Sequence, residues 1–491
     1  MRTIVVGAGA GGLAAAMQLQ AAGYATVLLD QHPWPGGKMR SVNSSSGPID
    51  AGPTVLTLRH IFDDLFQSTG ADLNDYLQLT REACLARHFW PDGSRLDLFD
   101  DREKSCRAVK AFSGSAAAAE FDRFTKEAQS LFETFDEPMI QTAEPSLARL
   151  AKAAMSAPGL LINLVPGMNL AARLSHRFSD ARLRQLFGRY ATYVGGSPLQ
   201  SPALLSLIWR AEEAGIWRVT GGLYRLANAM AQRFIELGGD LRLGTHISRI
   251  RVADQGIVGV ETDDHRHIDS DIVIYAGDPR ALAIGKLGDQ VKSVAPVTTR
   301  SPRSFSAHVW SFAATASIPE LIHHNVFFAA DPISEFSDLA VGRIPREPTI
   351  YVCAQDRGSG LQRPSGTERF EIILNAPALS GAFIHRGEKD QCRKRTFSQL
   401  AKYGLTFQPI PSTQSLTTPT DFDTLFPGSA GALYGQSPAG ITAGLRRPRA
   451  RTAIRGLYLA GGGTHPGAGV PMSALSGKHA AAMISADRAL I

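Results

Sequence analysis

A strand–glycine–helix pattern opens the chain and constrains its fold most. Residues 3–6 form a β-branched run that predicts a buried parallel strand. Gly7, Gly9 and Gly12 follow in G-x-G-x-x-G spacing, and residues 13–22, rich in Ala, Leu and Met, predict a helix. This order is that of a dinucleotide fold. Its three glycines permit the tight turn, the approach of backbone to a pyrophosphate, and close helix–strand packing.

An acidic residue after a second apolar run strengthens the pattern. Residues 25–29 predict another strand, and Asp30 follows it, 18 residues beyond Gly12. A carboxylate at this distance accepts hydrogen bonds from an adenosine ribose. The helix after the glycine turn offers free N–H groups and a positive dipole end to phosphates. A glycine-rich turn in an ordinary α/β protein is the alternative, and it fits this context less well.

The composition is that of a globular chain. The 491 residues, with 44% hydrophobic and 20% charged side chains, suit two or three domains. No run of about 18 apolar residues predicts a spanning helix. The chain starts with a core strand, so we expect no secretion signal and a cytoplasmic location. The four cysteines form no C-x-x-C pair, which favours reduced thiols over a zinc site or redox dithiol.

Positive charge is concentrated in two stretches. The net charge is +6 and the pI about 9.2. The clustered cations are Arg393, Lys394, Arg395, Arg446, Arg447, Arg449, Arg451 and Arg455. No nucleic-acid-binding module accompanies them, so we expect no nucleic-acid partner. Attraction to an anionic membrane surface and a solvated basic loop are the two remaining interpretations.

Two further glycine segments follow the second predicted strand. Gly37 and Lys38 lie in a Pro/Gly-rich loop that would bring N–H groups and a cation to a diphosphate. The alternative there is a plain turn. Gly52, Pro53 and Thr54 interrupt an apolar run. They would place backbone against a flat ring system, or form a turn beside a domain junction.

The middle of the chain changes character. Residues 59–79 predict an amphipathic helix and its connection, and 89–98 predict a hairpin. Residues 115–220 are mostly helical in pattern and interrupt the β/α alternation, which predicts an inserted domain. Within it, residues 147–174 are apolar and carry no acidic side chain. They form either an interfacial, membrane-dipping segment or a buried helix pair that lines an apolar cavity.

The β/α pattern then returns in separate pieces. Residues 221–238 predict a glycine-started helix and 271–277 a buried strand, whereas 300–420 contain mixed strands and helices. Residues 456–463 predict a strand that ends in glycines, before a final helix over 475–490. The nucleotide fold is therefore expected to be assembled from distant segments and to close at the end of the chain.

This arrangement resembles the two-dinucleotide-binding-domain flavoproteins. The stretch GLYLAGGGTHPGAGVP over 456–471 and the stretch RQLFGRYATYVGGSP over 184–198 are similar to motifs of the phytoene-desaturase-type carotenoid desaturases. Residues 52–57 and 472–479 most resemble the hydroxyneurosporene desaturase branch, the 1-hydroxycarotenoid 3,4-desaturases. The resemblance runs over the whole chain.

The resemblance implies an α/β fold with FAD as the cofactor. It implies a Rossmann-like FAD-binding domain made from residues 1–80, 221–290 and 450–491. A mixed α+β substrate domain would take residues 81–114 and 291–449, and the helical insertion 115–220 would face the membrane. No second G-x-G-x-x-G turn is present for a separate nicotinamide cofactor.

The resemblance also implies cofactor contacts at numbered positions. Three departures from the family pattern are Gln31 and Lys38, where arginine is commoner, and Thr464, where many flavoproteins have Asp. The implied cofactor-binding residues are Gly7, Gly9, Gly12, Asp30, Gly37, Lys38, Gly52, Pro53, Thr54, Ile247, Gly463, Val470, Pro471 and Met472. Ile247 would meet the adenine through its backbone, and Val470 to Met472 would lie at the flavin edge.

Desaturation removes a hydride equivalent and a proton, and the cofactor carries the difficult chemistry. This agrees with a sequence that shows no triad or metal cluster, so the catalytic residues stay unassigned. His465 in the last glycine-rich turn is the first candidate for proton transfer. A histidine that only shapes the turn is the alternative. We expect no metal at His323 and His324, because adjacent residues do not easily face one ion.

The expected function is desaturation of an acyclic hydroxylated carotenoid by a flavoenzyme that associates peripherally with the inner or intracytoplasmic membrane. The alternatives are a phytoene desaturase, another FAD amine-oxidase-like oxidoreductase, and a non-enzymatic prenyl-binding protein like the Rab GDP-dissociation inhibitors. The sequence predicts neither the electron acceptor nor the oligomeric state.

Overall fold

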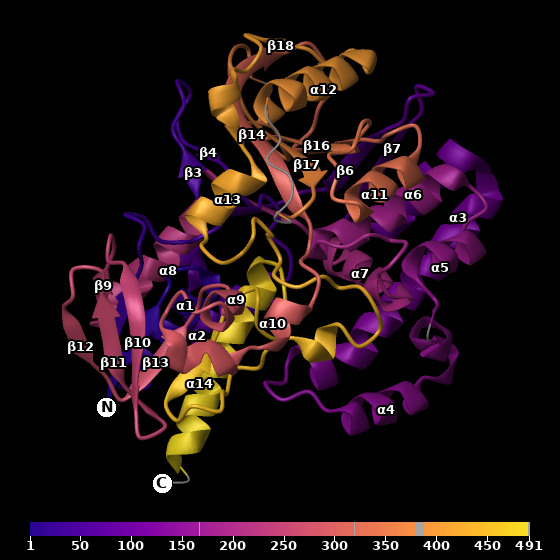
Figure 1. Cartoon of the computed structure of the whole chain (residues 1–491). Helices are drawn as coiled ribbons and strands as arrows, with labels where there is room; N and C mark the ends of the chain where they lie inside the picture. Colours follow the sequence, from indigo (N-terminus) through magenta and orange to yellow (C-terminus); the bar gives the residue numbers. More distant parts are fainter. Residues whose placement is uncertain (166, 319, 363, 380–386, 490–491) are drawn as a thin grey trace.

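The computed structural model describes residues 1–165, 167–318, 320–362, 364–379 and 387–489. In Figure 1, α3 and α6 lie beside β6 and β7 of the larger sheet, and α4 lies apart from that sheet at the lower right. A parallel sheet has the strand order β20-β13-β1-β2-β9. Its strands are β1 (Arg2–Val6), β2 (Ala25–Leu29), β9 (Asp240–Arg242), β13 (Ile272–Tyr275) and β20 (Leu457–Leu459).

The parallel sheet unites the predicted segments. Ile4 lies opposite Val27 on one side and Val273 on the other, and Ile274 lies opposite Tyr458. The predicted strands over 3–6, 25–29 and 271–277 are confirmed, and so is the closing strand within 456–463. The nucleotide-type turn is therefore built from the start, the middle and the end of the chain.

Glycines let the first and last helices pack closely. The helix α1 (Ala10–Ala21) packs against α14 (Val470–Ala489) and α8 (Tyr224–Glu236). A Cβ on Gly12 would lie 1.8 Å from the carbonyl oxygen of Gly7, and one on Gly477 would lie 2.0 Å from that of Gly11. Both contacts are backbone to backbone, so no side chain can move away to make room.

The second sheet is mixed and larger. Its order is β18-β14-β17-β16-β15-β6-β7, with β19 paired to β14. The strands are β6 (Cys84–Phe89), β7 (Arg95–Phe99), β14 (Ser306–Ala316), β15 (His324–Phe327), β16 (Ile350–Ala354), β17 (Glu368–Ala376), β18 (Phe407–Gln408) and β19 (Leu416–Thr417). The hairpin predicted over 89–98 is confirmed as the β6–β7 pair.

Smaller elements surround these sheets. The strands β10 (Ile247–Ala253), β11 (Gly256–Thr262) and β12 (His267–Asp269) form a separate antiparallel sheet. Two short pairs are β3 (Ser41–Val42) with β4 (Ile49–Asp50), and β5 (Leu79–Arg81) with β8 (Trp217–Val219). Further α-helices in the described part of the chain are α2 (His60–Gln67), α9 (Pro279–Ala283), α10 (Val297–Arg300), α11 (Pro332–Ala340), α12 (Glu388–Lys402) and α13 (Pro419–Leu425).

The helical region contains α3 (Arg102–Phe135), which the Asp101 carboxylate caps by accepting from the Lys104 N–H at 2.9 Å. A kink at Gly114, where φ is +89°, divides α3 next to the predicted start of the insertion at residue 115. The others are α4 (Leu147–Ser156), α5 (Leu170–Arg177), α6 (Ala181–Gly188) and α7 (Ile208–Glu213). An aromatic core, which includes Phe121, Phe187 and Trp209, holds this region against β6 and β15.

The segment 147–174 does not form the buried helix pair that was one of its two interpretations. In α4 only Ala154 is buried, whereas Leu147 and Met155 are 71% and 70% exposed. Ile162 and Val165 are exposed as well, although α5 is anchored by buried Leu170 and Leu174. Among the described residues, no helix combines the length and the apolar character needed to cross a membrane.

The α1–α14 contact generates a stability prediction. Gly477→Ala places a Cβ against the α1 backbone, so we expect it to cost about 3 kcal/mol, the upper end of the usual range for overpacking. Thermal denaturation should show a lower Tm. Gly366→Ala is the control, since a Cβ there meets no atom within 4 Å. Equal Tm values for the two variants would contradict the close helix contact.

A candidate dinucleotide site between the two sheets

A cavity of about 520 Å³ lies at the carboxyl ends of the parallel strands. The glycine turn after β1 forms one wall, and the residues after β13 and β20 form the next. On the opposite side, the cavity is lined by two residues of the large sheet, Val309 on β14 and Ile373 on β17. The cavity therefore lies where distant parts of the chain meet.

The glycine turn faces this cavity with bare backbone. A Cβ on Gly9 would meet no atom within 4 Å, so this position opens onto free space. Gly9 is also the N-cap of α1 and provides no side-chain cap, which leaves N–H groups of the first turn for a ligand. The Gly36 N–H donates to Ala8 O at 2.7 Å, which draws the loop of Gly37 against Gly9.

Asp30 lies at the cavity wall and is buried. One carboxylate oxygen accepts from the Ala8 N–H at 2.6 Å, and the other accepts from the His32 N–H at 2.8 Å. Burial raises the pKa of Asp30, and these two N–H groups oppose the increase. The carboxylate thus holds the glycine turn in place. The remaining lone pairs of its two oxygens can accept hydrogen bonds from a hydroxyl group of a ligand.

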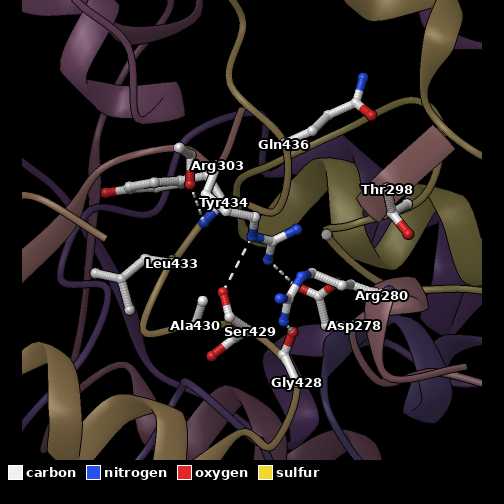
Figure 2. A network of polar contacts seen from close by, with 12 residues as sticks. Asp278, Arg280, Thr298, Arg303, Gly428, Ser429, Ala430, Leu433, Tyr434 and Gln436 are labelled. Carbon is white, nitrogen blue, oxygen red and sulfur yellow. Dashed lines mark hydrogen bonds and ion pairs between the residues drawn. The ribbon is translucent and has the colours of Figure 1, made fainter. Parts of the chain in front are cut away.

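Three cations surround a single carboxylate at the other end. Lys38 lines the cavity and donates to Leu433 O at 2.6 Å, while Arg447 donates to Gly462 O at 2.8 Å. Figure 2 shows Arg303 between Asp278, with which it forms an ion pair, and the Ser429 carbonyl, at 3.0 Å. We call Lys38, Arg303 and Arg447 the basic cluster.

The basic cluster carries more charge than Asp278 balances. Burial lowers the pKa of Lys38 to about 8 and that of Arg447 to about 10, and the nearby cations add to the effect. Arg303 acts on both groups in this direction, and Asp278 opposes it. A buried excess of positive charge is stabilised by an anion. Bare glycine backbone, a helix N-terminus and surplus cations together fit a dinucleotide diphosphate.

The structure brings most of the predicted cofactor residues together. Those that line the cavity are Gly7, Gly9, Asp30, Gly37, Lys38, Gly52, Pro53, Ile247, Gly463 and Val470. Gly12, Thr54, Pro471 and Met472 do not line it. Gly12 packs helix against strand instead, and the Thr54 hydroxyl lies 2.7 Å from that of Tyr351.

His465 lies outside the cavity. Its Nε2 lies 3.0 Å from Thr142 O, and its ring stacks on His479 at 6.0 Å between centroids. Burial lowers its pKa to about 4, so the imidazole is neutral at pH 7. These contacts favour the interpretation in which His465 shapes the turn.

The geometric argument against a metal at the adjacent histidines is wrong. The rings of His323 and His324 are 4.5 Å apart, and a ligand atom of each lies within 4.8 Å of the other and of Cys353 Sγ. The rings converge because His323 lies in a bend and His324 begins β15. Three ligand atoms are one short of a closed tetrahedral set, so the absence of a metal stays a prediction.

Several residues of the site were not predicted. Asp278 follows the end of β13, where a parallel sheet places ligand-binding residues, so its position in the sequence carried a usable signal. Tyr434 lines the cavity, and Arg303 and Arg447 lie next to lining residues without lining it themselves. All three come from irregular segments far from the glycine turn, and although Arg447 belongs to a predicted run of cations, nothing in the sequence connected that run with the site.

The fold and the site define a flavoprotein class, and comparison with known proteins agrees. The model of the family "Flavin containing amine oxidoreductase" matches residues 10–485. Among solved structures, putrescine oxidase bound to putrescine superposes with a TM-score of 0.63 at 15% identity, over 99% of each chain. A fatty acid isomerase from P. acnes gives 0.61 at 13%, over 99% of this chain and 98% of the other.

Closer relatives specify the branch. The chain is 50% identical over 488 residues to a hydroxyneurosporene desaturase of Cereibacter sphaeroides, covering 99% of this chain and 98% of the relative. It is 48% identical to one of Rhodobacter capsulatus, with the same coverage. It is 30% identical to a 4,4'-diapolycopene oxygenase of Methylomonas over 99% and 98%. The chain therefore belongs to the carotenoid desaturases among the flavin-containing amine oxidoreductases, and its cofactor is FAD.

The basic cluster predicts that FAD affinity depends on pH. The ammonium of Lys38 is present at pH 7 and is lost as the pH rises through about 8. We expect the affinity of the apoprotein for FAD, measured by fluorescence titration, to fall about tenfold or more between pH 7 and 9. Lys38→Met should bind FAD at pH 7 as weakly as the unmodified protein does at pH 9, and its affinity should not fall further between these two pH values.

The exposed Lys402, which pairs with Glu347 far from the cavity, provides the control. Lys402→Met should keep the affinity and the pH step of the unmodified protein. A Lys38→Met variant with the same pH profile as the unmodified protein would contradict a role of this ammonium at the diphosphate.

Proposed function

We propose that this chain introduces a carbon–carbon double bond into an acyclic hydroxylated carotenoid, by a hydroxyneurosporene-type 3,4-desaturation in carotenoid biosynthesis. The observation that carries the proposal is full-length identity of 40–50% to three hydroxyneurosporene desaturases. The enzyme is then an FAD-dependent oxidoreductase that acts on CH–CH groups. A phytoene desaturase is the enzymatic alternative, and a prenyl-binding protein without activity receives no support from these relatives.

The site supplies what such a reaction needs from the protein. FAD, when bound, supplies the acceptor for a hydride equivalent. The chain holds the diphosphate with the glycine turn and Lys38, and leaves Val309 and Ile373 as apolar contacts on the sheet side. The packed aromatic core against β6 and β15 adds apolar surroundings on the side of the large sheet. Apolar surroundings of this kind suit a long polyene.

The cofactor roles follow from this proposal. We assign the diphosphate to Gly7, Gly9, Gly37 and Lys38, and the ribose to Asp30. The other implied contacts, Gly52, Pro53, Ile247, Gly463 and Val470, lie on the same cavity. We retain 1–80, 221–290 and 450–491 as the FAD-binding domain, with 81–114 and 291–449 as the substrate domain. Strands from both sets face the cavity, which supports this division.

We further propose that the insertion 115–220 attaches the enzyme peripherally to the inner or intracytoplasmic membrane. Leu147 and Met155 expose apolar surface on α4 beside the exposed cations Arg149 and Lys152. The basic stretch joins this surface, because Arg449 donates to Pro145 O at 3.0 Å. Apolar side chains next to cations are typical of an interfacial segment on anionic lipid.

Not every arginine of the basic stretch contributes to that surface. Arg447 is buried against the Gly462 carbonyl, and Arg451 forms ion pairs with Glu144 at 2.8 Å and with Asp487 at 2.5 Å. Arg446 and Arg449 remain exposed. The membrane interpretation of the cluster therefore rests on fewer charges than its sequence suggested.

Carotenoid analysis tests the main proposal. Cells that accumulate hydroxyneurosporene should form a carotenoid with a red-shifted absorption spectrum when they express this chain, because one more double bond extends the polyene. Gly12→Val, which cannot form the glycine turn, should give no product. If the chain converts phytoene and does not convert hydroxyneurosporene, its assignment to the hydroxyneurosporene desaturase branch is wrong.

Vesicle binding tests the membrane proposal. The protein should co-sediment with phosphatidylglycerol vesicles, and the double variant Leu147→Glu, Met155→Glu should bind at least about tenfold more weakly, since each buried apolar side chain contributes about 1.5–3 kcal/mol. Ile235→Glu is the control, because Ile235 is 53% exposed on α8, away from α4. Equal binding of both variants would refute the role of α4.

A further inference from the structure

A row of polar side chains crosses the large sheet next to the cavity. The register places His324 on β15 opposite Cys353 on β16, Cys353 opposite Glu371 on β17, and Glu371 opposite Ser311 on β14. Residues directly opposite one another point to the same face of a sheet. All four are buried, and Glu371 has no exposed surface.

This row contains polar atoms without partners. Among the described residues, neither carboxyl oxygen of Glu371 forms a hydrogen bond, and the hydroxyl of Ser311 forms none. The backbone N–H of Gly52 acts on Glu371 electrostatically without reaching hydrogen-bond geometry. Each buried polar group left unpaired costs about 1–3 kcal/mol, so two adjacent ones call for a ligand.

The opposite end of the row is already satisfied in part. His324 Nδ1 lies 2.6 Å from the Tyr351 hydroxyl, which in turn lies 2.7 Å from that of Thr54. His323 Nε2 contacts Cys353 Sγ at 3.7 Å. His324 Nε2 has no partner among the described residues, but only Glu371 and Ser311 are adjacent members of the row whose side chains form no hydrogen bond at all in the described part of the chain.

Glu371 and Ser311 lie one step from the cofactor cavity. Val309 and Ile373, which line the cavity, are the next residues on the same face of β14 and β17. Two residues along a strand span about 6.7 Å. Gly52, whose backbone acts on Glu371, lines the cavity as well. Glu371 and Ser311 thus lie directly behind the cavity wall that Gly52, Val309 and Ile373 form.

The carboxyl of Glu371 is suited to a neutral polar ligand. Burial raises its pKa well above the usual value, and Asp50 raises it further, against the effect of Arg40. Arg40 directs one guanidinium nitrogen to the Thr417 hydroxyl at 2.8 Å. A carboxyl group offers two oxygens that accept hydrogen bonds, and a serine hydroxyl both donates and accepts one, so the pair can bind a hydroxyl group.

We propose that Glu371 and Ser311 form the subsite that binds the hydroxyl group of the carotenoid. The inference rests on the proposed function, in which the substrate carries a hydroxyl at C1 and reacts at C3–C4. Two bonds separate the hydroxyl-bearing carbon from C3, so the hydroxyl and the reacting bond occupy neighbouring parts of the chamber.

This subsite makes the enzyme selective as well as tight-binding. An acyclic carotenoid without the hydroxyl leaves Glu371 and Ser311 unpaired when it occupies the same position. Sites built to hydrogen-bond a substrate hydroxyl reject the analogue that lacks it by factors of about 10⁴–10⁵. The pair thus distinguishes hydroxylated from unsubstituted polyenes in a chamber that otherwise contacts both equally.

The test compares 1-hydroxyneurosporene with neurosporene. For the FAD-loaded protein we expect a higher kcat/KM with the hydroxylated substrate. Glu371→Leu should lower that preference at least about 100-fold, chiefly by loss on the hydroxylated substrate, and Ser311→Ala should lower it about tenfold. Glu371→Gln, which still donates and accepts, should retain most of it.

A second measurement does not depend on turnover. Equilibrium binding of both carotenoids in detergent micelles, followed by quenching of tryptophan fluorescence, should show the same loss for Glu371→Leu. FAD content and Tm verify that each variant is folded. Glu335→Gln is the matched control, since this buried carboxyl accepts from Asn375 and the Thr349 N–H at 2.9 and 3.0 Å.

The outcomes separate the two proposals. If the unmodified enzyme prefers the hydroxylated carotenoid and Glu371→Leu, with normal FAD content, keeps that preference in both measurements, the subsite is refuted and the function stands. If the unmodified enzyme does not convert the hydroxylated carotenoid, the proposed function fails and the subsite falls with it.

Discussion

The backbone contact between the first and the last helix is the constraint on which the rest of the structure depends. Gly11 and Gly477 let α1 and α14 approach until a single Cβ would collide with backbone. That contact places the N-termini of both helices, near Gly9 and Val470, at one cavity. The packing of α1 against α14 therefore fixes both ends of the cavity, the end proposed for the diphosphate and the end near the last glycine-rich turn.

Charge and polarity are divided within this cavity. The basic cluster gathers buried positive charge at one end, where a dianionic group offsets the cost of desolvation. On the sheet side, Val309 and Ile373 present apolar surface. A closed cavity and a buried positive charge oppose each other at Lys38, because the burial that shapes the cavity also lowers the pKa of Lys38 to about 8.

Local patterns in the sequence predicted the parallel sheet and the glycine turn well. Gly7, Gly9 and Asp30 act through short-range geometry, so their spacing was sufficient. Local patterns did not predict the basic cluster, since Arg303 and Arg447 come close to Asp278 at the cavity from distant irregular segments. The convergence of His323 and His324 was missed for the opposite reason: a bend of one residue, which no periodicity reveals, changed the direction of a side chain.

The polar row shows why fold and specificity are separable in this molecule. The backbone pairing of the sheet does not need a carboxyl at position 371, and the charged neighbour that favours a carboxylate there is the buried Arg40. A buried group that costs stability is retained more readily where a ligand uses it. The same face of the sheet thus presents aliphatic contacts at Val309 and Ile373, which suit any polyene. Two residues further along each strand it presents the polar pair Glu371 and Ser311, which suits only a hydroxylated polyene.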